Sequence, residues 1–118
     1  MSIRSTMVAA LLLGAGTAQA ATLPTSAPLL VADGNAYSCA VVNVTGKALT
    51  SVVLSVWRAD GSLGANTTCA PLDAGAVCSF ANPAVGDSYR YCNVTGANKT
   101  AVRGAFCNTV TSVCVPVQ

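Results

Sequence analysis

Six cysteines constrain what this chain of 118 residues can fold into more than any other feature. An even number of cysteines in a small exported chain predicts a disulfide framework, in which each bridge stabilises the fold by about 2–4 kcal/mol. A zinc site is the competing interpretation, and it is disfavoured because the chain has no C-x-x-C pair and no histidine. Six cysteines allow many pairings, so the connectivity needs further observations. The cysteines are Cys39, Cys69, Cys78, Cys92, Cys107 and Cys114.

The N-terminal segment has the three parts of a secretory signal peptide. Arg4 precedes an apolar run over residues 7–13, and Ala18-Gln19-Ala20 supplies the small-x-small ending. We predict a signal peptide over residues 1–20 with cleavage after Ala20. The apolar run is well short of the roughly 20 residues that span a bilayer, so we expect no membrane span after cleavage. The protein is therefore expected to be secreted or periplasmic.

The rest of the chain divides into a short leading segment and one domain. Residues 21–36 contain Pro24 and Pro28 and few polar anchors, so we expect a tether or an edge segment there. Residues 37–118 carry the cysteines and repeated strand patterns. We predict that they form a single β-sandwich domain.

Residues 51–58 show the strand pattern most clearly, because their alternating side chains place an entirely apolar set on one face of the strand. The predicted core face consists of Val52, Leu54 and Val56. Trp57 lies on the opposite face, and Asp60-Gly61 ends the strand with a turn signal. Shorter stretches of the same kind bring the number of strands to about seven. The predicted strands cover residues 37–45, 48–58, 66–70, 76–80, 88–95, 100–107 and 110–115.

Turn residues separate these strands at intervals of about 8–12 residues, which is typical of an antiparallel sandwich or barrel. No stretch shows a convincing helical period, so we expect an all-β domain. Within it, Pro71 to Gly75 connects two short strands that carry Cys69 and Cys78. This spacing predicts a disulfide across a hairpin between these two cysteines.

The charges and the residue types of the chain argue against several classes of function. The formal net charge is only +2 and no basic run is visible, which argues against a nucleic-acid partner. Without histidine, a serine or threonine nucleophile lacks its usual base, and neither Lys47 nor Lys99 stands in an S-x-x-K frame. The aspartates lie in or beside turns, and the turn Asp33-Gly34-Asn35 offers too few oxygens for calcium. We expect no enzyme activity, no metal and no cofactor.

The aromatic residues Trp57, Tyr89 and Tyr91 are the candidate binding face, with Arg58 at its rim. Trp57 lies opposite the predicted core face, and an exposed tryptophan often marks a contact with a ligand. Tyr89 and Tyr91 share a face of their own strand. The alternative is that one or more of these aromatics fills the core against a disulfide.

Two further features bear on function. Four N-x-T sequons suggest surface glycans if the chain passes through a eukaryotic secretory pathway, and mean little in a bacterium. They begin at Asn43, Asn66, Asn93 and Asn98. The segment from Pro71 to Gly75 is the candidate loop if the protein is a small secreted enzyme inhibitor.

Several short motifs follow one another in a recognisable order. A cysteine strand ends in Asn43, a valine-rich strand ends in Asp60-Gly61, and a C-x-L-x-x-G-x-x-C-like segment runs from Cys69 to Cys78. A Tyr-x-Cys strand ending in Cys92 comes next. A K-x-x-V-R-G/A-x-x-C ending runs from Lys99 to Cys107. The series resembles small exported bacterial β-sandwich proteins of uncharacterised function.

This resemblance covers most of the predicted domain and implies an immunoglobulin-like antiparallel sandwich without enzymatic activity. Together with the spacing, it favours the pairs Cys69 with Cys78 and Cys39 with Cys92. Cys107 and Cys114 would then close a C-terminal hairpin. The expected function is a structural or binding role, and the alternative is a carbohydrate- or protein-binding module that uses the aromatic face. The partner is an unknown protein or glycan.

Overall fold

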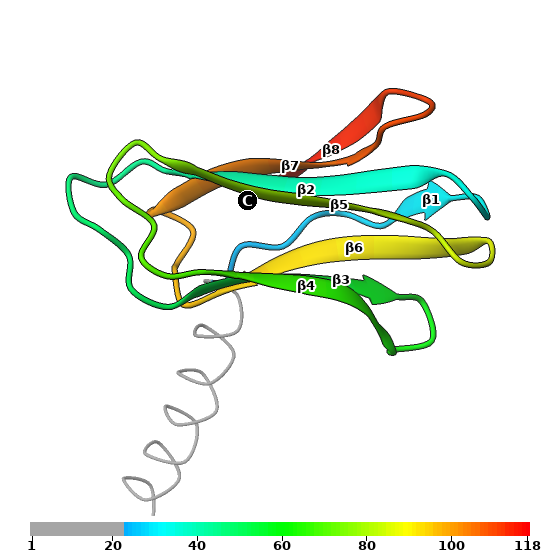
Figure 1. Ribbon diagram of the computed structural model, residues 1–118, viewed down its shortest axis with the longest axis horizontal. Coiled ribbons are helices and arrows are strands. Elements are labelled where there is room, and N and C mark those ends of the chain that lie inside the picture. Colours follow the sequence, from blue (N-terminus) through cyan, green and yellow to red (C-terminus); the bar gives the residue numbers. More distant parts are fainter. Residues whose placement is uncertain (1–22) are drawn as a thin grey trace, which may run out of the picture.

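Eight antiparallel strands form two sheets that pack face to face in the computed structural model, which describes residues 23–118 (Figure 1). The predicted signal peptide lies outside the described residues. The strands are β1 (Leu29–Val31), β2 (Ala36–Asn43), β3 (Val52–Arg58), β4 (Leu63–Cys69), β5 (Val77–Pro83), β6 (Ser88–Thr95), β7 (Val102–Asn108) and β8 (Val113–Val117). No helix occurs in this part of the chain.

Each sheet has four strands. The order in one sheet is β1-β6-β3-β4, which we call the β3 sheet, and the order in the other is β5-β2-β7-β8, which we call the β2 sheet. The expectation of an all-β antiparallel sandwich is confirmed, with eight strands in place of about seven. The additional strand is β1, which falls in the segment 21–36 and pairs with β6 at the edge of its sheet. The immunoglobulin-like character stays a prediction.

Strict alternation of side chains explains how these sequences form a two-layer core. Along β2, Tyr37, Cys39, Val41 and Asn43 are buried while their neighbours are partly exposed. On β3, the predicted core face is fully buried, since Val52, Leu54 and Val56 expose 0% of their surface. The aromatic contact inside the core joins Tyr37 to Phe106, whose ring centroids lie 6.0 Å apart in an edge-to-face arrangement.

Three disulfides join the same pairs that the sequence led us to expect. The bridge between Cys39 and Cys92 links β2 with β6, so it crosses the core from one sheet to the other. Its Cα atoms lie 6.3 Å apart. The bridge between Cys107 and Cys114 joins directly paired residues of β7 and β8, with Cα atoms 4.1 Å apart.

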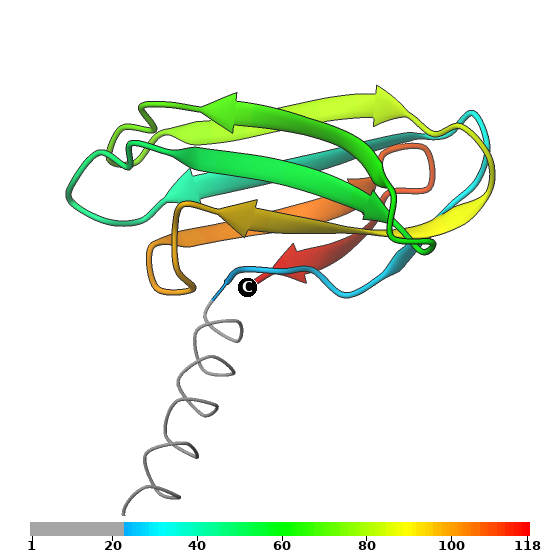
Figure 2. The same ribbon diagram turned by 90° about the horizontal axis from the view of Figure 1, so that it is seen from below.

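The third bridge corrects one expectation. Cys69 and Cys78 are bonded, with Cα atoms 6.1 Å apart, but their strands β4 and β5 belong to different sheets and form no hairpin. The connection arches from one sheet to the other because Leu72 is buried and exchanges both backbone hydrogen bonds with Leu49. The disulfide therefore ties together the edge strands β4 and β5 of the two sheets. Figure 2 shows these two strands side by side.

The segment before β1 closes the opposite side of the sandwich. The amide of Ser26 donates to the carbonyl of Cys92 on β6, and the Ser26 hydroxyl accepts from the amide of Cys92. Ser26 also forms a bridge with Val117 on β8, and the amide of Thr25 donates to the carbonyl of Gln118. Residues 24–26 thus contact both sheets.

Candidate functional site

The residues of the predicted binding face lie on the outer surface of the β3 sheet. Trp57 on β3 is directly opposite Tyr91 on β6 in one direction and opposite Leu63 on β4 in the other. Residues that face each other across antiparallel strands have side chains on the same surface of the sheet. These three side chains therefore form a row across three neighbouring strands.

Tyr89 and Leu30 extend this row to the edge of the sheet. Leu30 on β1 is directly opposite Tyr89 on β6, and Tyr89 lies on the same face as Tyr91. Both side chains are about half exposed, at 55% for Tyr89 and 52% for Leu30, and Leu63 is 44% exposed. Trp57 and Tyr91 in the centre of the row are partly buried. We define the aromatic face as Leu30, Trp57, Leu63, Tyr89 and Tyr91.

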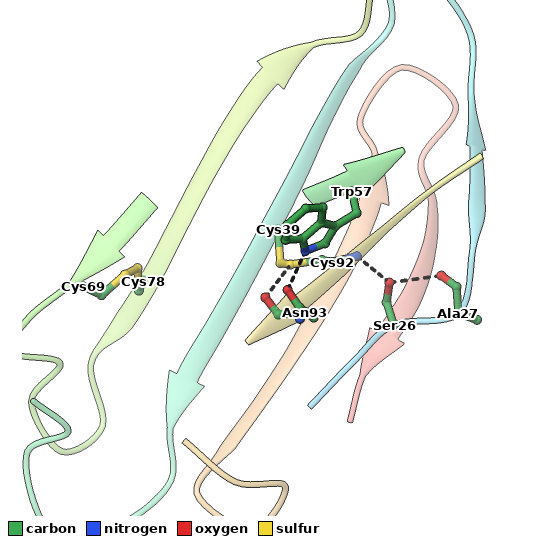
Figure 3. The surroundings of a disulfide bond; sticks show 8 residues. All are labelled: Ser26, Ala27, Cys39, Trp57, Cys69, Cys78, Cys92 and Asn93. Carbon is green, nitrogen blue, oxygen red and sulfur yellow. Dashed lines mark hydrogen bonds between the residues drawn. A yellow bond between two sulfur atoms is a disulfide. The ribbon is translucent and has the colours of Figure 1, made fainter. Parts of the chain in front are cut away.

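A hydrogen bond fixes the orientation of the central indole (Figure 3). The Nε1–H group of Trp57 donates to Oδ1 of Asn93 over 3.0 Å. Asn93 is two residues beyond Tyr91 on β6, so it belongs to the same outer face. Because the polar edge of the indole is satisfied inside the sheet surface, the ring is held in place before any ligand arrives.

No charged side chain belongs to this face. Arg58 follows Trp57 and points to the other side of β3, and its guanidinium donates to the hydroxyl of Ser62 and the carbonyl of Leu63. Arg58 is therefore held in the β3–β4 turn and does not lie beside the tyrosines. Other positions on the same surface of the sheet include Asn66, Thr68 and Thr95 together with Val53, while Ser55 is buried there.

The β3–β4 turn beside the aromatic face also contains Asp60. Its carboxylate accepts hydrogen bonds from the hydroxyl of Ser62 over 2.6 Å and from the amide of Ser62 over 2.8 Å. These bonds stabilise the charged form and lower the pKa of Asp60 below its ordinary value, and the charge of Arg58 adds to the effect. Asp60 is exposed, and both of its hydrogen bonds to Ser62 lie within the β3–β4 turn.

The carboxylates of Asp33 and Asp87 also accept hydrogen bonds from the backbone. Oδ1 of Asp33 accepts from the amide of Gly86, and Oδ1 of Asp87 accepts from the amide of Asp33, both over 2.7 Å. This reciprocal pair fastens the β1–β2 turn to the β5–β6 turn. All six cysteines are in disulfides, and residues 23–118 contain no group of His, Cys, Asp and Glu that could hold a metal ion.

The candidate inhibitor loop is folded against the domain. Leu72 in its centre is 3% exposed, and its carbonyl accepts from Nδ2 of Asn43 over 2.9 Å. The amide of Gly75 donates to the carbonyl of Asn43. The loop therefore presents only Pro71, Asp73, Ala74 and Gly75 to solvent, and its single large apolar side chain is inside.

The four sequons lie in different environments. Asn66 and Asn98 are exposed, and Asn93 is partly buried beneath the indole of Trp57. Asn43 is fully buried, and its Nδ2 donates to the carbonyls of Lys47 and Leu72. Both amide hydrogens of Asn43 are thereby used within the fold, so this asparagine cannot carry a glycan in the folded protein.

Sequence reasoning did not identify Leu30 and Leu63 as parts of the aromatic face. Leu30 lies in a strand of three residues, too short to show an alternating pattern. Leu63 reaches its position opposite Trp57 through a bulge between Val56 and Trp57, which shifts the register with β4. The only signal in the sequence was that both leucines are apolar residues close to turn residues.

Comparisons with known proteins give no family for the chain. No protein-family model matches it, and no curated protein matches it. Among solved structures, it is similar to FlgD from Xanthomonas campestris, whose structure concerns the hook capping essential for flagellar assembly, with a TM-score of 0.39 and 15% identity. The match covers 81% of this chain, which spans 64% of that one.

The FLGD of P. aeruginosa is similar at a TM-score of 0.36 and 9% identity, over 81% of this chain and 73% of that one. Likenesses at this level carry no argument about function. Residues 23–118 also contain no helix that is long and apolar enough to cross a membrane.

Proposed function

We propose that the chain is an extracytoplasmic, non-catalytic binding module, and that its aromatic face binds a neutral glycan. The observation that carries this proposal is the row of Tyr91, Trp57 and Leu63 across three strands, extended by Tyr89. The three disulfides support an oxidising compartment outside the cytoplasm.

The chemistry of the face favours sugars over charged ligands. A pyranose ring presents a surface of C–H groups that packs on an aromatic ring and a rim of hydroxyl groups that need hydrogen-bond partners. The aromatic face supplies the first with Trp57 and Tyr91, and Asn66 and Thr95, one and two residue pairs further along the same surface, supply the second. Since the face has no charge, a phosphate or uronate group would find no counter-charge there.

The absence of catalysis is part of the proposal, and the structural uses of several reactive side chains support it. Asp33, Asp60 and Asp87 accept hydrogen bonds that fasten turns, and every cysteine is oxidised. A purely structural role is the alternative, and it would leave the aromatic face without a ligand. The buried position of Leu72 in the candidate inhibitor loop gives no support to an inhibitor role.

The experiment is a binding titration that uses Trp57 as its reporter, because it is the only tryptophan of the chain. Soluble neutral polysaccharides, such as mixed-linkage β-glucan, xylan, mannan and chitin oligosaccharides, are added to the oxidised protein while tryptophan emission is recorded. Isothermal titration calorimetry then gives the affinity. We expect one class of neutral glycan to shift the emission and saturate.

Variants decide whether the aromatic face is responsible. We expect Tyr91→Ala to weaken binding about tenfold or more, because the loss of a central aromatic contact costs more than about 1.4 kcal/mol. Val77→Ala, on the outer surface of the β2 sheet, is the matched control and should bind normally. Equal binding by both variants, or no binding of any neutral glycan, would contradict the proposal. If a protein bound through the same face, the chain would still be a binding module, but the proposal that its ligand is a neutral glycan would be wrong.

A further inference from the structure

The four edge strands of the two sheets are protected to very different degrees. Free edges of sheets invite pairing with another chain, and proteins usually block them with short strands, bulges, prolines, charges or covering segments. The strand β1 has only three residues, β4 contains a bulge next to Trp57, and β8 contains Pro116. The segment with Thr25 and Ser26 also covers β8.

The strand β5 has none of these protections over most of its length. Its seven residues pair with β2 in a continuous register from Val77 to Pro83, without a bulge. It carries no charged residue, and its only proline is the last residue of the strand. Figure 2 shows this strand along the border of the molecule, beside β4 of the other sheet.

The hydrogen bonds at both ends of β5 establish which of its backbone groups face outward. The carbonyl of Ala76 accepts from the amide of Asn43, and the amide of Ala84 donates to the carbonyl of Asn35. Because backbone groups alternate in direction along an antiparallel strand, the even-numbered residues of β5 face β2. The N–H and C=O groups of Val77, Ser79 and Ala81 therefore point away from the sheet.

These outward groups have no partner among the described residues. No hydrogen bond within residues 23–118 involves the backbone N–H or C=O of Val77, Ser79 or Ala81 outside the ladder with β2. The strand thus offers a short row of alternating donors and acceptors. That row is what an added strand requires.

We propose that β5 pairs with β5 of a second copy of this chain in an antiparallel arrangement, with the twofold axis at Ser79. In this register Ser79 lies opposite Ser79 of the partner, and Val77 lies opposite Ala81 of the partner. Each of these facing pairs exchanges both of its hydrogen bonds, so every outward backbone group of the three residues finds a partner. The two β2 sheets become one continuous sheet.

The side chains and charges of the edge fit a second copy. Because β5 has no charged residue, the twofold pairing brings no like charges together. On the outer surface, Val77 is 66% exposed and borders a shallow, largely apolar depression of about 360 Å³, which it lines with Ala40, Val42 and Ala105, and Arg103 of β7 also lines it. In the dimer, Ala81 of the partner covers the exposed side of Val77.

The association should be weak, because one strand pair buries far less than the roughly 1,200–2,000 Å² of a stable interface. We would measure it by sedimentation velocity of the oxidised protein from about 10 µM to about 1 mM, the range in which weak complexes become populated. The expected result is a monomer at low concentration that shifts reversibly to a dimer. A monomer across the whole range would overturn the proposal.

Charged variants at the twofold axis test the register. In Ser79→Lys and Ser79→Glu, like charges lie directly opposite each other, so each variant alone should remain monomeric. An equal mixture of the two should recover the dimer, because opposite charges then face each other. Ser38→Lys, on the outer surface of β2 and one strand away from the edge, is the matched control and should dimerise normally.

Two outcomes would refute the arrangement. One is a dimer that Ser79→Lys leaves intact, and the other is a dimer that Tyr91→Ala abolishes, since that result would assign the interface to the aromatic face. A mixture of the Lys and Glu variants that stays monomeric would exclude the register centred on Ser79. Far-ultraviolet circular dichroism of each variant establishes that it is folded.

Discussion

Arg90 is a cation buried between the two sheets, with 1% of its surface exposed. Its guanidinium donates to the backbone carbonyls of Val31, Val85, Gly86 and Ser88 at distances of 3.0 to 3.2 Å. It also lies 5.7 Å from the centre of the Tyr37 ring, which contributes a cation–π interaction. A buried charge is costly unless its hydrogen bonds are satisfied, and here backbone dipoles satisfy them. Arg90 thereby holds β1 and the β5–β6 turn to the end of the sandwich.

We expect Arg90→Ala to lower the free energy of unfolding by about 3 kcal/mol or more, since one buried and three partly buried hydrogen bonds to backbone carbonyls are lost. Urea unfolding followed by tryptophan fluorescence measures the change. The matched control is Arg103→Ala, whose exposed guanidinium donates to the carbonyls of Lys99 and Val102. The control should change stability by less than about 0.5 kcal/mol. Similar effects of the two substitutions would contradict the structural role of Arg90.

A second prediction concerns the pKa of Asp60. The hydroxyl of Ser62 is the largest cause of its lowered pKa, so Ser62→Ala should move the pKa of Asp60 back up toward 3.8. Because the pKa is lower in the folded chain, the contribution of Asp60 to stability is complete above its ordinary pKa. It is lost as the pH falls through the lowered pKa. Titration of the carboxyl carbon by NMR measures both values, and an unchanged pKa in the variant would refute the assignment.

At the scale of single elements, β7 approaches β2 unusually closely at Gly104. A Cβ atom on Gly104 would collide with the carbonyl oxygen of Ala40 and with the side chain of Val41. The position therefore requires glycine because the strands pack too tightly for a methyl group, and its φ angle plays no part. β7 lies between β2 and β8 in its sheet, and Gly104 pairs with Val41 of β2.

Gly104→Ala should accordingly destabilise the protein by about 2 kcal/mol or more, as expected for overpacking against backbone. Gly46→Ala is the control, since a Cβ atom there meets nothing within 4 Å. Thermal unfolding monitored by circular dichroism compares the two variants. If both melt at the temperature of the parent protein, the close approach at Gly104 has no energetic consequence.

The elements differ in how much of them could be predicted from the sequence. Alternation placed the core face of β3 correctly, and the predicted turns contain glycines with positive φ, such as Gly34 and Gly61. These features depend on neighbouring residues alone. The hairpin expected at Cys69 and Cys78 was wrong, because a spacing that fits a hairpin also fits an arch between two sheets. Only the burial of Leu72 against Leu49 decides between them.

The candidate site could be predicted only in part, because only some of its features depend on neighbouring residues alone. Trp57 could be assigned to the outer face by counting along its own strand, but its neighbours depend on which strands pair and in which register. Arg58 was expected at the rim of this face, but alternation turns its side chain to the other side of β3, where Ser62 and Leu63 hold its guanidinium. The burial of Arg90 follows from its place on the same face of β6 as Cys92 and Val94.

For the molecule as a whole, the bridge between Cys39 and Cys92 is the central connection. It lies at 0% exposure and joins inner strands of the two sheets, whereas the bridge between Cys69 and Cys78 joins two edges. The first closes a sequence separation of 53 residues and the second a separation of 9. A longer closed loop restricts the unfolded chain more strongly.

Replacing both cysteines of a bridge by alanine should therefore cost about 4 kcal/mol for Cys39 and Cys92, and about 2.5 kcal/mol for Cys69 and Cys78. The buried bridge should lose more still, because the substitution leaves space in the core. Urea unfolding of the two double variants gives the comparison. The reverse order of stabilities would contradict the central role of the inter-sheet bridge.

The burial of Asn43 affects the choice of host in which to produce this protein. Oligosaccharide transfer in the endoplasmic reticulum acts on sequons of a chain that is still being translocated, before β2 and the arch at Leu72 have formed. A sugar attached to Asn43 at that moment would occupy the space of the carbonyls that its amide must reach. Such chains would be retained as misfolded glycoprotein, so a periplasmic host without this modification is the suitable choice for making the protein.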